Sequence, residues 1–150
     1  MEVRHASHCT YRIRYHLVLV LKYRKRLITS EIFAYMQKIC SGISARYYFY
    51  FEALGSDGDH LHIVVECAPK HSPSEVMQIC KSILAKQVFK KFPKLREELW
   101  GGEFWSDGGH VDSIGDGRGL DEVKKYVSNQ GKKSPQLTLF EFVRESPVTK

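Results

Sequence analysis

The chain has 150 residues, of which 43% are hydrophobic and 27% are charged. That length suits one domain, and apolar residues this plentiful exclude a largely disordered chain. The longest aliphatic run, Leu17 to Leu21, is far shorter than the roughly 20 residues of a membrane-spanning helix. Residues 1–8 lack the apolar core of a secretory signal, so we expect a cytoplasmic protein that does not contact membranes. The four cysteines include no C-x-x-C pair, which favours buried thiols over a zinc knuckle or a disulfide framework.

The net charge of +6 is unevenly distributed. Residues 1–30 contain seven basic residues and one acidic residue, Glu2. Residues 81–96 contain six basic residues and no acidic residue. Two basic clusters of this kind favour a polyanionic partner, with nucleic acid first in line. A surface that is unevenly charged and has no such partner is the alternative.

The first part of the chain predicts a strand followed by a helix. Residues 11–21 alternate aromatic or aliphatic side chains with arginine and then become almost wholly apolar, which is typical of a strand whose far end is buried on both faces. After the basic loop 22–26, Thr29 or Ser30 can cap a helix that runs to about Arg46. The buried face of this helix is predicted to carry Ile32, Met36, Ile39 and Ile43.

The middle of the chain predicts a hairpin and a second helix. The aromatic segment 47–54 and the segment 60–67 are predicted strands, and the short turn between them makes them a β-hairpin. Ser72 precedes a proline and lies three residues before a glutamate, so it should cap a helix that ends near Phe92. The buried face of this second helix is predicted to carry Val76, Ile79, Ile83 and Val88.

The last part of the chain predicts two short strands and a helix. Residues 103–106 and 110–114 flank a glycine-rich turn and should form a hairpin-like element, and residues 120–130 should form the final helix. The order β-α-β-β-α-β with an added helix is that of an α+β, ferredoxin-like split-βαβ sandwich with an antiparallel sheet and helices on one face. We assign residues 1–133 to this single domain and residues 134–150 to a C-terminal tail.

His60-Leu61-His62 is the most specific local pattern in the sequence. Because alternate side chains of a strand share a face, both imidazoles should point to one side and Leu61 to the core. A strand presents two metal ligands in this way, and Asp57 and Asp59 are near enough in sequence to orient an imidazole by a hydrogen bond. Chance is the alternative, because H-x-H alone is a weak pattern in a chain with seven histidines.

Tyr126 and Gln130 lie four residues apart in the predicted final helix and therefore share a face. A tyrosine hydroxyl can act as a nucleophile when a neighbouring group or a metal favours its deprotonation. The amide oxygen of glutamine suits Mg²⁺ or Mn²⁺ as a ligand. A tyrosine packed on the sheet and a solvated glutamine are the alternative.

Other patterns are less informative. No glycine-rich nucleotide loop and no G-x-S-x-G motif is present, which argues against a nucleotide-dependent enzyme and a serine hydrolase. The segment 100–105 (WGGEFW) is either a surface for stacked bases or a structural corner. His71 and His110 have no evident partners and are expected to be exposed polar residues.

Taken in order, these segments resemble the single-tyrosine HUH transposases of small bacterial and archaeal insertion sequences. The resemblance spans roughly residues 11–131. The turn 107–110 is richer in glycine and more polar than the family pattern, which affects the expected local DNA contacts and not the chemistry. The matching segments are 15–18 (YHLV) and 22–24 (KYR) for the first strand and basic loop, 59–62 (DHLH) for the His-hydrophobic-His motif, 92–95 (FPKL) and 99–102 (LWGG) for the segment after the second helix, and 123–127 (VKKYV) with Gln130 for the catalytic helix.

The resemblance implies a DNA transposase that cleaves and rejoins single-stranded DNA through a 5′-phosphotyrosine intermediate. Tyr126 would be the nucleophile, and His60, His62 and Gln130 would bind Mg²⁺ or Mn²⁺. The implied substrate carries subterminal hairpins, and the implied enzyme is a homodimer whose composite sites pair the histidines of one subunit with the tyrosine helix of the other. The basic segments would contact the DNA backbone through Lys22, Arg24, Lys25, Arg26, Lys81, Lys86 and Lys90.

Two other functions compete with this one. A nucleic-acid-binding module on a ferredoxin-like sheet explains the basic segments and the aromatic residues but leaves the histidine pair and the Tyr126/Gln130 spacing as coincidences. A related HUH nuclease that processes repeat elements or replication origins shares the chemistry and differs in its biological role.

Overall fold

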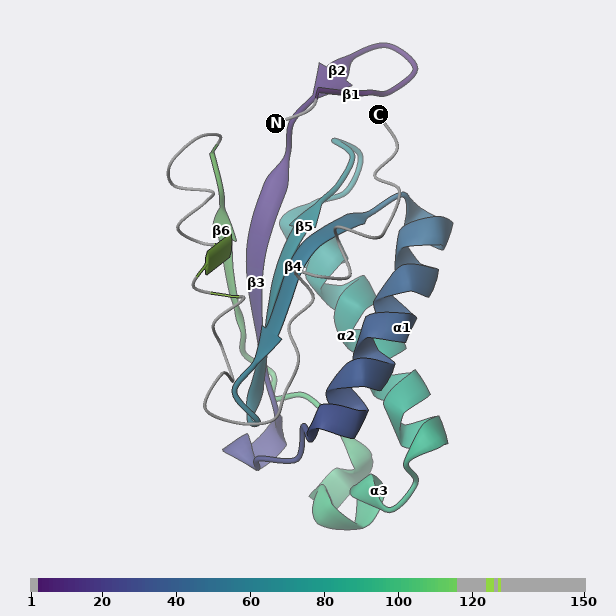
Figure 1. The fold of residues 1–150 in the computed structure, drawn as a ribbon, viewed down its shortest axis with the longest axis vertical. Coiled ribbons are helices and arrows are strands. Elements are labelled where there is room, and N and C mark those ends of the chain that lie inside the picture. The colour runs from purple at the N-terminus through teal and green to yellow at the C-terminus, as the bar shows by residue number, and fades with distance from the viewer. Residues whose placement is uncertain (1–2, 116–123, 126, 128–150) are drawn as a thin grey trace.

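The computed structural model describes residues 3–115, 124, 125 and 127. A four-stranded antiparallel sheet with strand order β4-β5-β3-β6 is covered on one face by two long helices (Figure 1). This arrangement confirms the predicted α+β, ferredoxin-like fold with its βαββαβ order. The elements are β3 (Arg14–Val20), α1 (Ser30–Tyr47), β4 (Tyr50–Ser56), β5 (His60–Glu66), α2 (Pro73–Lys91) and β6 (His110–Ser113).

A small hairpin that was not predicted precedes the sheet. Strands β1 (Arg4–His5) and β2 (Thr10–Tyr11) pair with each other, so the strand expected over 11–21 begins only at Arg14 in the main sheet. The side chains of Arg4 and Glu66 are buried and joined by an ion pair of 2.9 Å, which attaches the hairpin to β5.

The expectation of four buried thiols is wrong for Cys9. It lies in the loop of the β1–β2 hairpin, where no layer covers it, and is exposed. The other three cysteines, Cys40, Cys67 and Cys80, are buried and free, as predicted.

Both predicted helix starts are confirmed by their caps. Thr29 Oγ1 accepts a hydrogen bond from the backbone N–H of Ile32 (3.2 Å), and Ser72 Oγ accepts one from that of Glu75 (3.1 Å). These bonds satisfy backbone donors that the first helical turn leaves unpaired. Helix α1 ends at Tyr47, close to the predicted end near Arg46. Tyr48 follows in a left-handed conformation (φ 58°), and the next strand begins at residue 50 instead of 47.

The core lies between the sheet and the two helices. The α1 residues predicted to face it are all buried. The predicted face of α2 is partly wrong, because Ile79 and Ile83 are only partly buried while Cys80 and Leu84 are fully buried. A buried cysteine packs as a small apolar residue, and its position rotates the buried face of α2 by one residue. No helix within the described residues combines the length and apolar character of a membrane span.

The predicted pairing of segment 103–106 with segment 110–114 is wrong. Both segments lie along the same edge of β3: Trp105 forms a bridge with Leu21, and β6 pairs with residues 15–18 of β3. Two segments that follow one another along one edge cannot also pair with each other. Short elements fill the remaining connections, namely η1 (Lys22–Arg24), α3 (Leu95–Glu98) and η2 (Trp100–Gly102).

Candidate active site

Strand β5 places His60 and His62 on the sheet face that the helices do not cover. Leu61 and Ile63 alternate with them and are fully buried against the helices, which confirms the predicted shared face of the two imidazoles. Their ring centroids are 4.7 Å apart. The two side chains are less exposed than expected for an open strand face, because His60 is half-buried and His62 is only 5% exposed.

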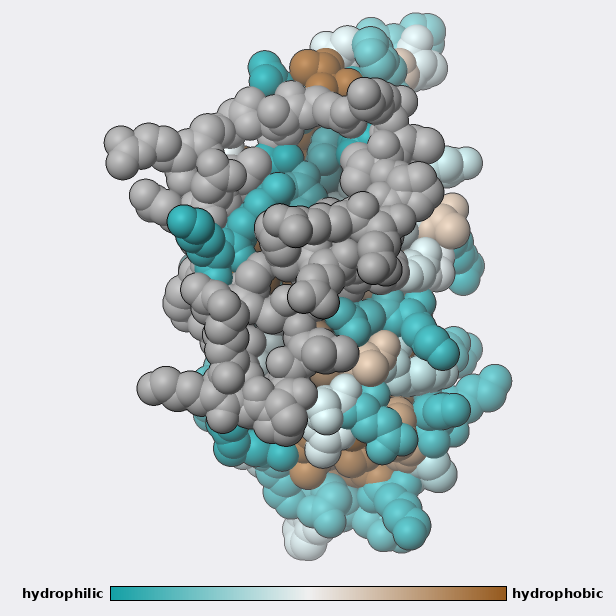
Figure 2. Space-filling view, viewed as in Figure 1, coloured by the Kyte–Doolittle hydropathy of each residue, from teal (hydrophilic) through white to brown (hydrophobic). Residues whose placement is uncertain are grey.

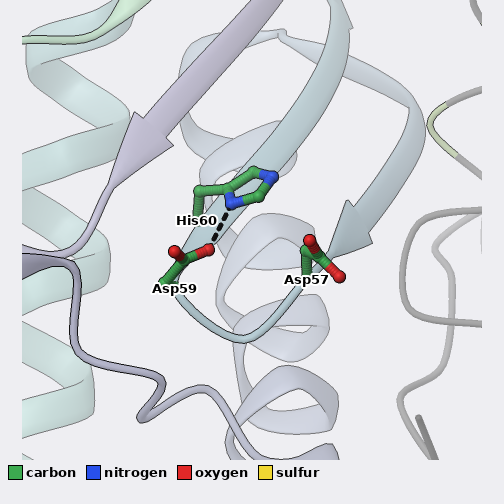
Figure 3. A group of neighbouring side chains, drawn as sticks. All are labelled: Asp57, Asp59 and His60. Atoms are coloured by element: carbon green, nitrogen blue, oxygen red, sulfur yellow. Dashed lines mark hydrogen bonds and ion pairs between the residues drawn. The ribbon is translucent and has the colours of Figure 1, made fainter. Parts of the chain in front are cut away.

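Asp59 orients the His60 ring. Its Oδ1 lies 2.5 Å from Nδ1 of His60, and in Figure 3 the other ring nitrogen points away from this carboxylate. Its Oδ2 is 3.8 Å from Nε of Arg24, which links the basic loop to the histidine. Ligand atoms of Asp57, Asp59 and His60 all lie within 4.8 Å of one another, so this turn gathers the donor types that bind cations.

His16 of β3 is a member of this cluster that sequence reasoning did not single out. Its Nε2 is 3.0 Å from Nδ1 of His62, and the two rings stack with centroids 5.2 Å apart. The signal was available, because His16 alternates with Leu17 and Leu19, which are buried under the helices. The period of two therefore puts His16 on the same face as the histidine pair.

Burial favours the neutral form of two imidazoles in the cluster, those of His62 and His16. Burial, with the neighbouring His60 and His16, lowers the pKa of His62 from 6.5 to about 3. Burial also lowers the pKa of His16, although the nearby Asp112 acts in the opposite direction. Neutral imidazole is the form that binds metals, so these rings are in a ligand state at neutral pH.

Strand β6 extends the polar face at the sheet edge. His110 Nε2 lies 2.8 Å from Asp112 Oδ2, and the two residues pair across the strands with Val18 and His16 of β3. His110 is exposed, as expected, but it has a partner that the sequence did not reveal. His71, also expected to be exposed, is instead partly buried: its side chain is 12% exposed, its ring packs edge-on against Phe49, and its Nδ1 contacts the carboxylate of Glu75.

The segment around Tyr126 contacts this same face through the residues that flank it. Lys124, Lys125 and Val127 are helical, and Val127 is fully buried against Ala53 and Val64. Val64 is two residues after His62 in β5 and therefore lies on the same sheet face as the histidines. Tyr126 and Gln130 themselves lie outside the described residues.

A buried carboxylate ties the Lys124 segment to the sheet. Glu52 is the extra residue of a β-bulge in β4. Its Oε1 accepts from Nε of Arg14 at 2.8 Å, and its Oε2 lies 2.9 Å from Nζ of Lys124. Burial raises the pKa of Glu52, but the bonds from Lys124 and Arg14 outweigh it, so the net pKa is lowered. We call the Arg14, Glu52 and Lys124 side chains the Glu52 latch.

The predicted DNA-contacting cations fall on two different surfaces. The basic loop with Lys22, Arg24, Lys25 and Arg26 lies at the His60 end of the sheet, where Arg24 approaches Asp59. Lys86 and Lys90 are instead exposed on α2, in the layer that covers the opposite face. Lys81 is engaged within the protein, because its ammonium donates to the carbonyls of Ser106 (3.0 Å) and Gly108 (2.8 Å). The contacts of these residues with DNA stay a prediction.

Residues 9–130 match the family described as IS200-like transposases. The ISDra2 transposase TnpA of Deinococcus radiodurans is 23% identical over 130 residues, which cover 87% of this chain and 92% of that protein. The transposase of insertion sequence element IS200 from Salmonella typhimurium is 27% identical over 128 residues, which cover 83% and 80%.

Two solved structures resemble the fold. One is a crystal structure of a Deinococcus radiodurans R1 transposase candidate, with a TM-score of 0.69 and 24% identity over 85% of this chain and 97% of that chain. The other is a REP-associated tyrosine transposase bound to a REP hairpin, with a TM-score of 0.61 and 11% identity over 97% of this chain and 89% of that chain. At these identities, the likeness by itself shows only that the fold is shared.

Proposed function

Because this chain belongs to the IS200-like transposase family, we propose that it cleaves and rejoins single-stranded DNA through a 5′-phosphotyrosine intermediate. Transposases are enzymes that cleave and rejoin DNA, so family membership confirms the prediction that the chain is an enzyme. The observation that carries the proposal is the sheet face opposite α1 and α2. There His16, His60 and His62 meet, and there Val127, the residue after Tyr126, is buried.

The donors on this face fit a divalent metal ion. Asp59 engages Nδ1 of His60 and His16 engages Nδ1 of His62, which is how partners outside the ligand set orient metal-binding imidazoles. We propose that both histidines bind Mg²⁺ or Mn²⁺ through Nε2, with Gln130 as the third protein ligand. A bound ion would polarise the scissile phosphate and offset the charge that develops on it.

Tyr126 supplies the nucleophile in this proposal. Its hydroxyl oxygen bonds to phosphorus as the bond from phosphorus to the 3′ oxygen breaks, with attacking and leaving oxygens in line. The proton that tyrosine loses is gained, in net terms, by the released 3′-hydroxyl. The phosphodiester energy is kept in the covalent link, so rejoining needs no nucleotide cofactor. This agrees with the lack of a glycine-rich nucleotide loop in the sequence.

We propose single-stranded DNA with hairpin ends as the substrate. Support comes from the basic loop beside Asp59 and from a structural neighbour that was solved with a REP hairpin. An active site of this kind needs a strand that base pairing does not hide. We expect the reaction to take place in the cytoplasm, where the DNA of a bacterial or archaeal insertion sequence is found.

Incubation with labelled hairpin strands and Mg²⁺, followed by denaturing electrophoresis, tests the proposal. The wild type should form a covalent protein–DNA band, and Tyr126→Phe should bind the same DNA without forming the band, since only the hydroxyl is removed. A band that persists in Tyr126→Phe would overturn the role of this residue. DNA binding with no band in the wild type would favour the non-catalytic binding module.

The reaction products separate the transposase from the related HUH nuclease. A transposase should join the two ends of an excised strand and insert it into a target. A nuclease that serves repeats or origins should cleave its own site and reseal it without transfer to a target. Strand-transfer products on a second, unlabelled oligonucleotide therefore decide between the two.

A homodimer with composite sites stays a prediction. The contacts of Lys124 with Glu52 and of Val127 with Ala53 support the alternative, in which the tyrosine segment docks on its own sheet. Mixing a His60→Ala/His62→Ala subunit with a Tyr126→Phe subunit, after verified exchange, decides the question. Recovered cleavage indicates shared sites, whereas no cleavage indicates self-contained ones.

A further inference from the structure

Two large aromatic side chains are exposed at the end of the sheet where β5 begins. Tyr23 in η1 is 57% exposed and Trp100 in η2 is 79% exposed. The neighbours of Trp100 along the chain, Leu99, Phe104 and Trp105, are buried. Those three residues fill the structural corner, so packing gives no reason for an indole at position 100. We call Tyr23 and Trp100 the aromatic pair.

The aromatic pair is held in place by contacts between two segments far apart in sequence. The hydroxyl of Tyr23 donates to the carbonyl oxygen of Trp100 (3.2 Å). Lys25 Nζ donates to the carbonyl oxygen of Glu98 (2.7 Å), which docks the basic loop on α3. In Figure 1 the end of β3 and the region of α3 meet at the lower end of the molecule. A surface ordered in advance loses less conformational entropy when a ligand binds.

The backbone is strained where it presents the aromatic pair. The strained residues are Tyr23 and Arg24, with φ of 61° and 51°, whereas Gly101, directly after Trp100, adopts its φ of 83° without strain. Left-handed conformations are uncommon for residues other than glycine. Such strain persists only where surrounding contacts impose it, and it concentrates at ligand-binding and active sites.

Cations surround the aromatic pair and connect it to the histidines. Lys22, Arg24 and Lys25 are close to Tyr23 along the chain. The guanidinium of Arg96 lies beside Gly102, two residues after Trp100, with Nη1 3.4 Å from the position that a Cβ on Gly102 would occupy. Much of this charge is balanced, because Lys22 pairs with Glu103, Lys25 pairs with Glu98, and Arg24 approaches Asp59. Hydrophilic side chains dominate this lower end in Figure 2. Since Asp59 also binds His60, a strand that reaches the pair is close to the proposed metal site.

We propose that Tyr23 and Trp100 form a stacking site for unpaired bases of the single-stranded DNA that flanks the cleaved phosphate. This rests on the proposed function, which makes single-stranded DNA the substrate. Aromatic faces beside cations bind single strands by stacking with the bases and attracting the backbone. Each stacked base contributes about 5- to 100-fold in affinity. A blunt duplex, whose bases stack on each other, gains nothing from the site.

Equilibrium binding of two DNA probes to the full chain tests the inference. The probes are an oligothymidylate single strand and a blunt-ended linear duplex, both at one salt concentration because phosphate contacts depend on salt. Trp100→Ala should weaken binding of the single strand about 5- to 100-fold and leave that of the blunt duplex within about twofold. Trp100→Phe, which keeps a stacking ring, should recover most of the loss.

Tyr48 provides a matched control. It is 66% exposed and also has a left-handed backbone (φ 58°), but it lies at the C-terminal end of α1. Tyr48→Ala should leave the affinity for both probes unchanged, while Tyr23→Ala should weaken binding of the single strand selectively. Fluorescence gives an independent signal. The chain has two tryptophans, and because Trp105 is buried, quenching by oligothymidylate should disappear in Trp100→Phe.

Unchanged single-strand affinity in Trp100→Ala would overturn the inference, and so would equal weakening with both probes. If the substitution instead dissociates a dimer, as light scattering would show, the pair contacts a second copy of the chain and the inference is wrong. Covalent band formation on the same proteins separates this result from the proposed function. Selective binding without a band contradicts only the cleavage chemistry, whereas a normal band with unchanged affinity in Trp100→Ala contradicts only the stacking site.

Discussion

The two faces of the sheet carry different tasks on the same strands. One face presents Leu19 and Leu61, which are fully buried against the helices. The other presents His16 and His62, which contact each other through their ring nitrogens. Because side chains alternate along a strand, neighbouring residues of β5 serve stability and chemistry in turn. A substitution on the histidine face is therefore expected to remove activity while the packing on the helix-covered face keeps the protein folded.

Metal removal should have the largest effect and should act on the histidine face alone. Excess chelator should abolish the covalent protein–DNA band, because the scissile phosphate loses its electrophilic partner. Hairpin binding should persist, and the midpoint of thermal unfolding should move little, since the apolar core is untouched. Electrophoresis, a binding titration and calorimetry measure the three quantities. Undiminished cleavage in chelator would show that the histidines do not serve a metal.

The next effect concerns the residues that orient the imidazoles. His16→Phe keeps a ring but removes the nitrogen that contacts His62, and Asp59→Ala removes the carboxylate on His60. Loss of such a partner weakens metal binding by about 10- to 100-fold. Mn²⁺ affinity by electron paramagnetic resonance checks this without reference to activity. A control substitution, Tyr15→Phe on the same strand, should leave the affinity unchanged.

How far the sequence could predict this structure depends on how local each signal is. The caps at Thr29 and Ser72 and the alternation through His60, Leu61 and His62 involve near neighbours, and the structure confirms all three. The role of His16 required a contact with a residue 46 positions away. The predicted pairing of segment 103–106 with segment 110–114 was wrong for the same reason. Trp105 bridges instead to Leu21, which is distant in sequence and continues the edge of β3.

The Glu52 latch should have a moderate effect, because it holds the segment beside Tyr126 to the histidine face. Lys124→Met removes the charge that reaches Oε2 of Glu52 and should slow formation of the covalent band several-fold while leaving Mn²⁺ affinity unchanged. The single variants Glu52→Lys and Lys124→Glu should both be slower than the wild type. The charge-exchanged double variant should recover part of the rate if the pair itself matters. A double variant that is slower than both single variants would contradict a direct pairing.

The smallest effect separates the two basic surfaces. Arg24→Ala and Arg26→Ala, in the loop at the histidine end of the sheet, should each lower the log–log salt slope of hairpin binding by about 1. Lys86→Ala and Lys90→Ala, on the helix layer, should change the slope less. Affinities measured over a range of salt concentrations check this. Equal changes from both groups would mean that DNA also crosses the helix layer.

The most direct test of the central claim compares Leu61 and His62, which are adjacent in the chain and on opposite faces of β5. Leu61→Ala should lower the free energy of unfolding by about 2–5 kcal/mol and, at a temperature where it is folded, still form the covalent band. His62→Ala should lose the band and keep a free energy of unfolding close to that of the wild type. Calorimetry and electrophoresis on the same two preparations give both quantities. A His62→Ala protein that unfolds like Leu61→Ala, or one that still cleaves, would contradict the division of tasks between the two faces.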